Sequence, residues 1–229
     1  MSIMLWSRSS ILRLPIPSRV AAVLGLALIL ALALLRPSTA LADTTILALG
    51  DSLTAGYGLK KGEGFADQLQ TAFRKMGRPV TVINGGVSGD TSAGGLARID
   101  WALGDKPAVV IVELGANDML RGIRPDTTRA NLAGIIDKAK ASGAKVLLCG
   151  MMAQRNLGEE YVQQFDAIYP ELAQQEGVAL YPFFMDGIIR PDGTADRALL
   201  QGDGMHPTQA GAALIVERLM PVLLPLLGS

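Results

Sequence analysis

The strongest constraint on the fold of this chain is an alternation of short apolar runs with longer amphipathic stretches. The apolar runs predict five strands, at Thr45–Leu49, Val80–Ile83, Val109–Leu114, Lys145–Cys149 and Val178–Leu180. The longer stretches predict helices at Gly64–Met76, Ala93–Ala102, Thr127–Ala141, Glu159–Glu176 and Thr208–Leu224. This pattern is typical of an α/β fold with a parallel sheet covered by helices on both faces. Because "VVIVEL" is almost continuously apolar, we expect the third strand to be central.

The first 42 residues predict a signal peptide for export. In order, they contain a basic leader, an apolar run and a small-x-small cleavage site: Arg8, Arg13 and Arg19, then Val20–Leu35, then Ala40-Leu41-Ala42. An uncleaved membrane anchor is the alternative, because a helix of about 17 residues can nearly span a bilayer. We expect cleavage, with a periplasmic or secreted mature protein of residues 43–229 that has no stable insertion in the membrane.

The composition of residues 43–229 excludes several classes of function. This part of the chain fits a single domain, for which a monomer is the simplest expectation, and its formal net charge is −4, so nothing in it suggests a nucleic-acid partner. The chain has one cysteine and one histidine, so we expect neither a metal nor another cofactor. The cysteine, Cys149, lies in the apolar run "KVLLCG" and predicts a buried, inert thiol. A dinucleotide site is also not supported, because "GDSLTAG" lacks the G-x-G-x-x-G spacing.

The segments that follow four of the predicted strands are candidates for a functional site. They are "GDSLTAGYG" (50–58), "NGGVSGDTSAG" (84–94), "GANDMLRG" (115–122) and "MMAQRN" (151–156). In open parallel sheets ligands bind outside the carboxyl ends of the strands, where such segments meet. The convergence of small and polar residues in the first three segments therefore predicts a site at this edge.

Ester hydrolysis by a serine needs a hydroxyl, a base and an acceptor that orients the base. His206 is the only histidine and is therefore the candidate base, and Asp203 precedes it at a spacing that a turn can close. Ser52 follows the first strand directly and is the candidate nucleophile. The backbone N–H groups of Ser52 and Gly89 and the side-chain amide of Asn117 are candidate oxyanion donors. Taken singly, Ser52 also fits a helix cap, Gly89 a loop glycine and Asn117 a turn residue.

Taken together, "GDSL", "SGDTS", "LGANDM" and "DGMHP" resemble the SGNH hydrolases, also called GDSL esterases and lipases. Further stretches, "AIYPELA" and "LYPFFM", resemble the branch of periplasmic thioesterase I, lysophospholipase L1 and arylesterase. The resemblance implies a three-layer α/β/α flavodoxin-like fold with five parallel strands in the order 2-1-3-4-5. It also implies a Ser52–His206–Asp203 triad and an oxyanion hole formed by Ser52, Gly89 and Asn117.

The resulting hypothesis is a serine esterase that hydrolyses acyl esters, such as aryl esters, acyl thioesters or lysophospholipids, through an acyl-enzyme on Ser52. Two alternatives remain open, a carbohydrate O-acetyl esterase and a non-catalytic binding module. The loop residues Met119, Leu120, Met151 and Met152 favour a small-molecule or lipid substrate with a long acyl chain, although they also fit a core.

Some neighbouring residues are assigned other roles. Asp51, Asp90 and Asp118 are expected to be structural. The segment Met119–Arg124 fits either a mobile flap or an ordered loop.

Overall fold

The computed structural model describes residues 44–190 and 192–228 of the 229-residue chain. The predicted signal peptide falls outside the described residues. The sheet has five parallel strands in the order β2-β1-β3-β4-β5, which confirms the predicted order 2-1-3-4-5. Its strands are β1 (Thr44–Gly50), β2 (Val80–Gly86), β3 (Val109–Glu113), β4 (Lys145–Cys149) and β5 (Ala179–Tyr181).

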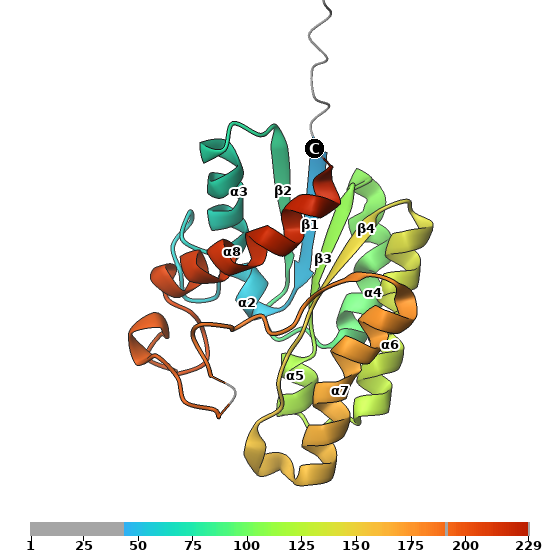
Figure 1. Ribbon diagram of the computed structural model, residues 1–229, viewed down its shortest axis with the longest axis vertical. Coiled ribbons are helices and arrows are strands. Elements are labelled where there is room, and N and C mark those ends of the chain that lie inside the picture. The colour runs from blue at the N-terminus through green and yellow to red at the C-terminus, as the bar shows by residue number, and fades with distance from the viewer. Residues whose placement is uncertain (1–43, 191, 229) are drawn as a thin grey trace, which may run out of the picture. The chain divides into compact units, whose positions relative to one another are not determined.

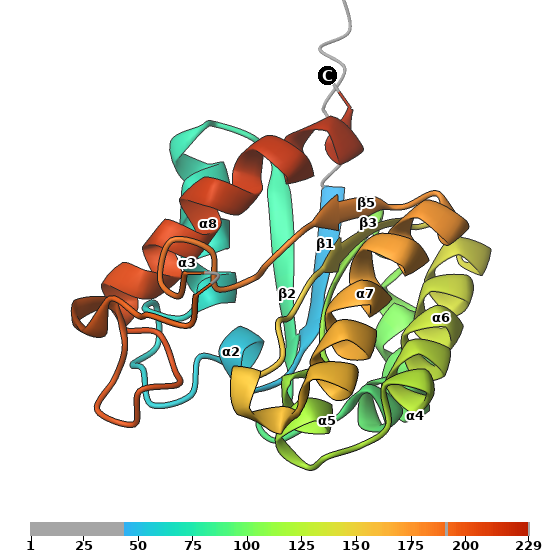
Figure 2. The same ribbon diagram turned by 60° about the horizontal axis from the view of Figure 1, so that its bottom comes forward.

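Helices cover both faces of this sheet. They are α2 (Ser52–Ala55), α3 (Phe65–Lys75), α4 (Ser92–Ala102), α5 (Ala116–Leu120), α6 (Pro125–Ala141), α7 (Glu159–Glu176) and α8 (Gln209–Leu223). Helices α3 and α8 pack together on one face, and α4, α6 and α7 pack side by side on the other (Figures 1 and 2). The result is the predicted three-layer α/β/α architecture.

The boundaries differ from the predicted ones in small ways. Strand β2 continues three residues beyond Ile83, and β5 lies one residue later than predicted. The short helices α2 and α5 were not predicted, because four or five residues are too few to show helical periodicity. Both follow a strand directly, and in Figure 2 both lie beyond the carboxyl end of the sheet.

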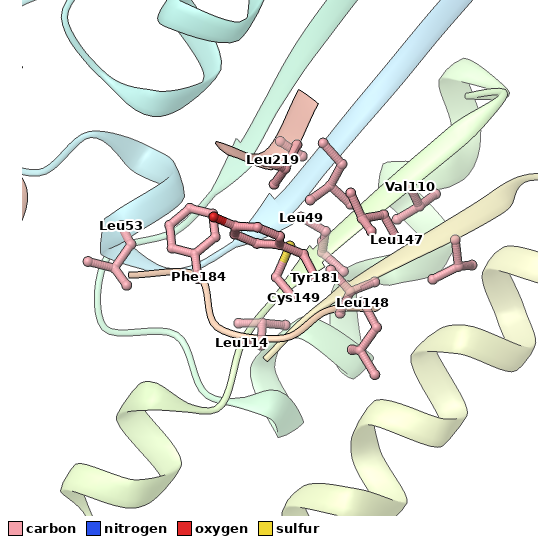
Figure 3. Close-up of a cluster of buried hydrophobic side chains, with 14 of the residues drawn as sticks. Leu49, Leu53, Val110, Leu114, Leu147, Leu148, Cys149, Tyr181, Phe184 and Leu219 are labelled. Atoms are coloured by element: carbon pink, nitrogen blue, oxygen red, sulfur yellow. The ribbon is translucent and has the colours of Figure 1, made fainter. Parts of the chain in front are cut away.

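The central position of β3 is confirmed by its burial. Val109, Val110, Ile111 and Val112 are all 0% exposed, and β3 lies between β1 and β4. Cys149 at the end of β4 lies in the core near Leu114 and Tyr181 (Figure 3). Burial raises the pKa of the Cys149 thiol well above its usual range, so the thiol is protonated and inert, as predicted.

By length and composition alone, the segment Gln209–Leu227 could cross a membrane. In the structure, its helix α8 packs against α3 and β5. Ala212, Ile215, Leu219 and Leu223 on α8 are almost fully buried. The apolar character of α8 is therefore that of a core helix.

Candidate active site

The carboxyl ends of the strands place four loops at one edge of the sheet. Gly50 at the end of β1 is in register with Gly86 of β2 and with Glu113 of β3. Ser52 begins helix α2 two residues after this register, and the Asp51 carboxylate caps the helix by accepting the Leu53 N–H at 2.9 Å. Asn117 stands in the first turn of α5, just after β3. Ser52 and Asn117 lie at the same edge of the sheet because each stands shortly after the end of a parallel strand.

Ser52, His206 and Asp203 form a connected chain of hydrogen bonds. Ser52 Oγ lies 2.8 Å from His206 Nε2, although the two residues are 154 positions apart in the sequence. His206 Nδ1 lies 2.6 Å from Asp203 Oδ2. This geometry can move a proton from the serine hydroxyl to the imidazole.

The backbone around Asp203 holds that carboxylate in place. Its Oδ1 accepts the N–H groups of Met205 at 2.9 Å and His206 at 3.0 Å. These two backbone hydrogen bonds, together with the imidazole, lower the pKa of Asp203 to about 2. Asp203 is therefore ionised throughout the neutral range and can fix the orientation of His206.

Gly89 and Asn117 face the same pocket as Ser52 and His206. Gly89 has a φ of +81°, a conformation that strains any residue with a Cβ. In the described part of the chain, the N–H groups of Ser52 and Gly89 donate to no other protein group. One N–H of the Asn117 amide donates to Asp51 Oδ2 at 2.9 Å. Ser52, Gly89 and Asn117 therefore line one pocket, as the candidate donors of an oxyanion hole must.

The pocket has a volume of about 560 Å³ and a largely apolar wall. Its apolar side chains come from the segments that follow β1, β3, β4 and β5 and include Leu53, Tyr57, Met119, Leu120, Met151, Met152, Phe183, Met185, Ile189 and Met205. The volume lies within the range of small-molecule sites. In the part of the chain that the structure describes, no group of three or more His, Cys, Asp or Glu side chains is placed to hold a metal ion.

The three neighbouring aspartates have structural contacts. Asp118 is fully buried and accepts hydrogen bonds from the Ser92 N–H and hydroxyl and from Thr128 Oγ1, which join α5 to α4 and α6. Asp90 forms an ion pair with Arg98 at 2.7 Å. Asp51, besides capping α2, contacts Asn117, so its role extends beyond the loop backbone.

A model of the family described as GDSL-like lipase/acylhydrolase matches residues 48–214 of this chain. The chain belongs to this family. It is 43% identical over 171 residues to esterase TesA of Pseudomonas aeruginosa, over 74% of this chain and 83% of that protein. It is 39% identical over 150 residues to thioesterase 1/protease 1/lysophospholipase L1 of Escherichia coli K12, over 65% of this chain and 69% of that protein.

A crystal structure of TesA matches with a TM-score of 0.74 at 42% identity, covering 80% of this chain and 99% of that one. The resemblance to the thioesterase I and lysophospholipase L1 branch is thereby confirmed. As a member of a GDSL acylhydrolase family with esterases among its near relatives, the protein is a carboxylic ester hydrolase.

Three residues of this GDSL site were missed at the sequence level. Glu113 is fully buried beside the nucleophile loop, Tyr57 packs its ring 4.6 Å from the His206 ring, and Arg98 binds the carbonyls of Gly85 and Gly50. For Glu113 a signal existed, since it is the only charged residue within an apolar run that predicted burial on both faces. Tyr57 and Arg98 show no such local signal, because their partners lie far away in the sequence.

Proposed function

We propose that Ser52 is the nucleophile of this esterase, His206 its general base and Asp203 the residue that orients His206. The observation that carries the proposal is the 2.8 Å contact between Ser52 Oγ and His206 Nε2. In the first step His206 takes the Ser52 proton while Ser52 Oγ attacks the acyl carbonyl. The carbonyl oxygen gains negative charge and accepts hydrogen bonds from the N–H groups of Ser52 and Gly89 and from the Asn117 amide.

Collapse of this intermediate expels the alcohol or thiol, which takes the proton from His206, and leaves an acyl-enzyme on Ser52. Water then attacks the acyl-enzyme with His206 again as base, and the acid leaves. Asp203 remains ionised throughout and stabilises the imidazolium form of His206.

For the substrate we infer an acyl ester or thioester with an apolar acyl chain, including aryl esters and lysophospholipids. The apolar wall of the pocket supports this class over an acetylated sugar, because sugar hydroxyls would lose their hydrogen bonds to water against methionine side chains. The names of the relatives agree, since they are an esterase and a thioesterase/lysophospholipase.

We further propose that residues 1–42 are an export signal and that residues 43–229 act as a monomeric enzyme in the periplasm or outside the cell. The basic leader, apolar run and Ala40-Leu41-Ala42 site support this proposal. Sequencing the N-terminus of the protein recovered from the periplasm tests it, and an intact Met1 would contradict it.

A serine-directed fluorophosphonate tests the role of Ser52. The wild-type protein is expected to be labelled at Ser52 and to hydrolyse p-nitrophenyl esters, whereas Ser52→Ala loses both properties while it keeps its circular dichroism spectrum. Substitution of the nearby Ser88, which also lines the pocket, by Ala is the matched control and should leave labelling intact. Full hydrolysis by Ser52→Ala would overturn the proposed mechanism.

A further inference from the structure

Two buried carboxyl groups lie directly beneath the nucleophile. Asp51 is 1% exposed and Glu113 is 0% exposed. Glu113 Oε2 accepts a hydrogen bond from Thr54 Oγ1 at 2.7 Å and one from the Asp51 N–H at 3.3 Å. A Cβ added at Gly50 would collide with Thr54 Oγ1 and Glu113 Oε2, so Glu113 fills the space against the turn that carries Ser52.

The surroundings of this pair decide which carboxyl group holds a proton. Within residues 44–190 and 192–228, neither carboxyl group has a lysine or arginine ion-pair partner. Two neighbouring buried carboxylates cannot both remain ionised without such a partner. Each carboxyl group accepts two hydrogen bonds, but those of Asp51 are divided between its two oxygens, whereas both of those to Glu113 fall on Oε2 and leave Oε1 without a partner. The negative charge is therefore better stabilised on Asp51, and the proton belongs on Glu113.

The pKa shifts support the same placement of the proton on Glu113. Complete burial and the neighbouring Asp51 raise the pKa of Glu113 well above its usual range. Burial also raises the pKa of Asp51, to about 6, against the opposing effects of Leu53, Asn117 and His206. Glu113 is thus neutral and Asp51 ionised at neutral pH.

The ionised Asp51 carboxylate contacts the Asn117 amide, which faces the pocket. A primary amide carries two N–H bonds in one rigid plane. When a charged acceptor holds one N–H at 2.9 Å, the direction of the other is set. A free asparagine side chain would rotate and spend part of its time pointing away from the oxyanion.

We propose that Asp51 is the positioning residue of the oxyanion donor Asn117, and that the neutral Glu113 beneath it keeps the charge of the pair on Asp51. The proposal rests on the proposed function, because it takes Asn117 as an oxyanion donor. Asp51 itself does not touch the reacting atoms.

A double-mutant cycle between Asp51 and Asn117 tests the first half. Asp51→Asn replaces one of the two acceptor oxygens of the Asp51 side chain with an N–H donor and so weakens its hold on Asn117. For a p-nitrophenyl ester, kcat should fall by roughly 10- to 100-fold while KM stays within about twofold of the wild-type value. Asn117→Ala should lower kcat by roughly 100- to 1,000-fold. Because Asp51 acts through Asn117, adding Asp51→Asn to Asn117→Ala should change kcat by no more than about twofold. If the reductions in kcat caused by the two single substitutions multiply in the double variant, the proposal is overturned.

Asp51→Ser separates amide positioning from helix capping. Serine is a good N-cap and can still accept the Leu53 N–H, but its side chain is too short to hold Asn117 as the carboxylate does. The Ser variant should therefore fold and show the same loss of kcat and the same non-additivity with Asn117→Ala. Wild-type kcat in folded Asp51→Ser would contradict the proposal.

Infrared difference spectroscopy tests the second half. At pH 7 the wild-type protein should show a protonated-carboxyl C=O band that Glu113→Gln lacks and that Glu217→Gln, an exposed substitution on α8, retains. An unchanged spectrum in Glu113→Gln would refute the neutral glutamic acid. If Ser52→Ala stays active, the proposed function fails. If Ser52→Ala is inactive and Asn117→Ala is impaired but the effects in the cycle are additive, only this inference fails.

Discussion

At the scale of single residues, contacts on several sides keep His206 in one orientation. These contacts matter because its partner Asp203 is partly exposed, with 33% of its side chain accessible to solvent. The two ring nitrogens of His206 contact Asp203 and Ser52, and the Tyr57 ring covers it at 4.6 Å with an interplanar angle of 39°. Gln201 fixes the Tyr57 segment in turn, because its amide donates to the carbonyls of Tyr57 and Pro207. The loop that carries His206 is thereby tied to the loop that follows Ser52.

Glu113→Gln should change how stability depends on pH. The folded pKa of Glu113 lies above the unfolded value of 4.5, so its contribution to stability is fully present below pH 4.5 and is lost as the pH rises. The loss amounts to as much as about 1.4 kcal/mol per pH unit. Gln does not titrate, so urea unfolding should show Glu113→Gln gaining stability relative to wild type as the pH rises from 4.5 to 8. A difference in the free energy of unfolding between Glu113→Gln and wild type that does not vary with pH would contradict this prediction.

At the scale of elements, arginines connect the loops of the site. Arg98 on α4 donates to the carbonyls of Gly85 at 2.7 Å and Gly50 at 3.0 Å, and pairs with Asp90. Arg121, after α5, donates to the Gly89 carbonyl at 2.7 Å. The segment Met119–Arg124, for which the sequence left a flap or an ordered loop open, is anchored here by Arg121 and by Tyr161, which donates to the Ile123 carbonyl.

Arg98→Lys should weaken both the fold and the site. One ammonium group cannot replace three guanidinium contacts in different directions, so the free energy of unfolding should fall by about 2 kcal/mol. Displacement of the Gly89 and Ser52 loops should also lower kcat/KM by about tenfold, or about 1.4 kcal/mol in the transition state. Urea denaturation and ester hydrolysis measure the two effects. Arg74→Lys, at an exposed position on α3, is the control and should change the free energy of unfolding by less than about 0.5 kcal/mol. Equal effects of the two substitutions would refute this role of Arg98.

At the scale of the whole molecule, the pocket is a product of loops from both halves of the chain. Its walls combine residues that follow β1, β2, β3 and β4 with the segment between β5 and α8. Because apolar side chains from four of these segments line one space, acyl chains can bury their methylene groups there.

Acyl-chain preference tests this use of the pocket. Each buried methylene contributes about 0.8 kcal/mol, so kcat/KM should rise roughly fourfold per methylene from acetyl esters until the pocket is filled. Met152→Glu, at a partly buried lining position, should reduce hydrolysis of an octanoyl ester far more than that of an acetyl ester. A preference for acetyl esters that the substitution leaves unchanged would exclude the acyl-chain pocket.

The sequence by itself predicted the five strands, the five longer helices and the candidate residues of the site. Strand and helix periodicity are local properties, so the central strand at Val109–Val112 and the polar segments after each strand were readable from neighbouring residues. The strand order was predicted only through family resemblance, because nothing local specifies which strands pair.

Only the tertiary structure decided what depends on contacts between distant residues. Ser52 meets His206 across 154 positions, and Glu113 is completely buried against Thr54 and Asp51. The link from Asp51 to Asn117 likewise spans 66 positions. Such distances and protonation states follow from packing, in which many weak interactions along the whole chain act together.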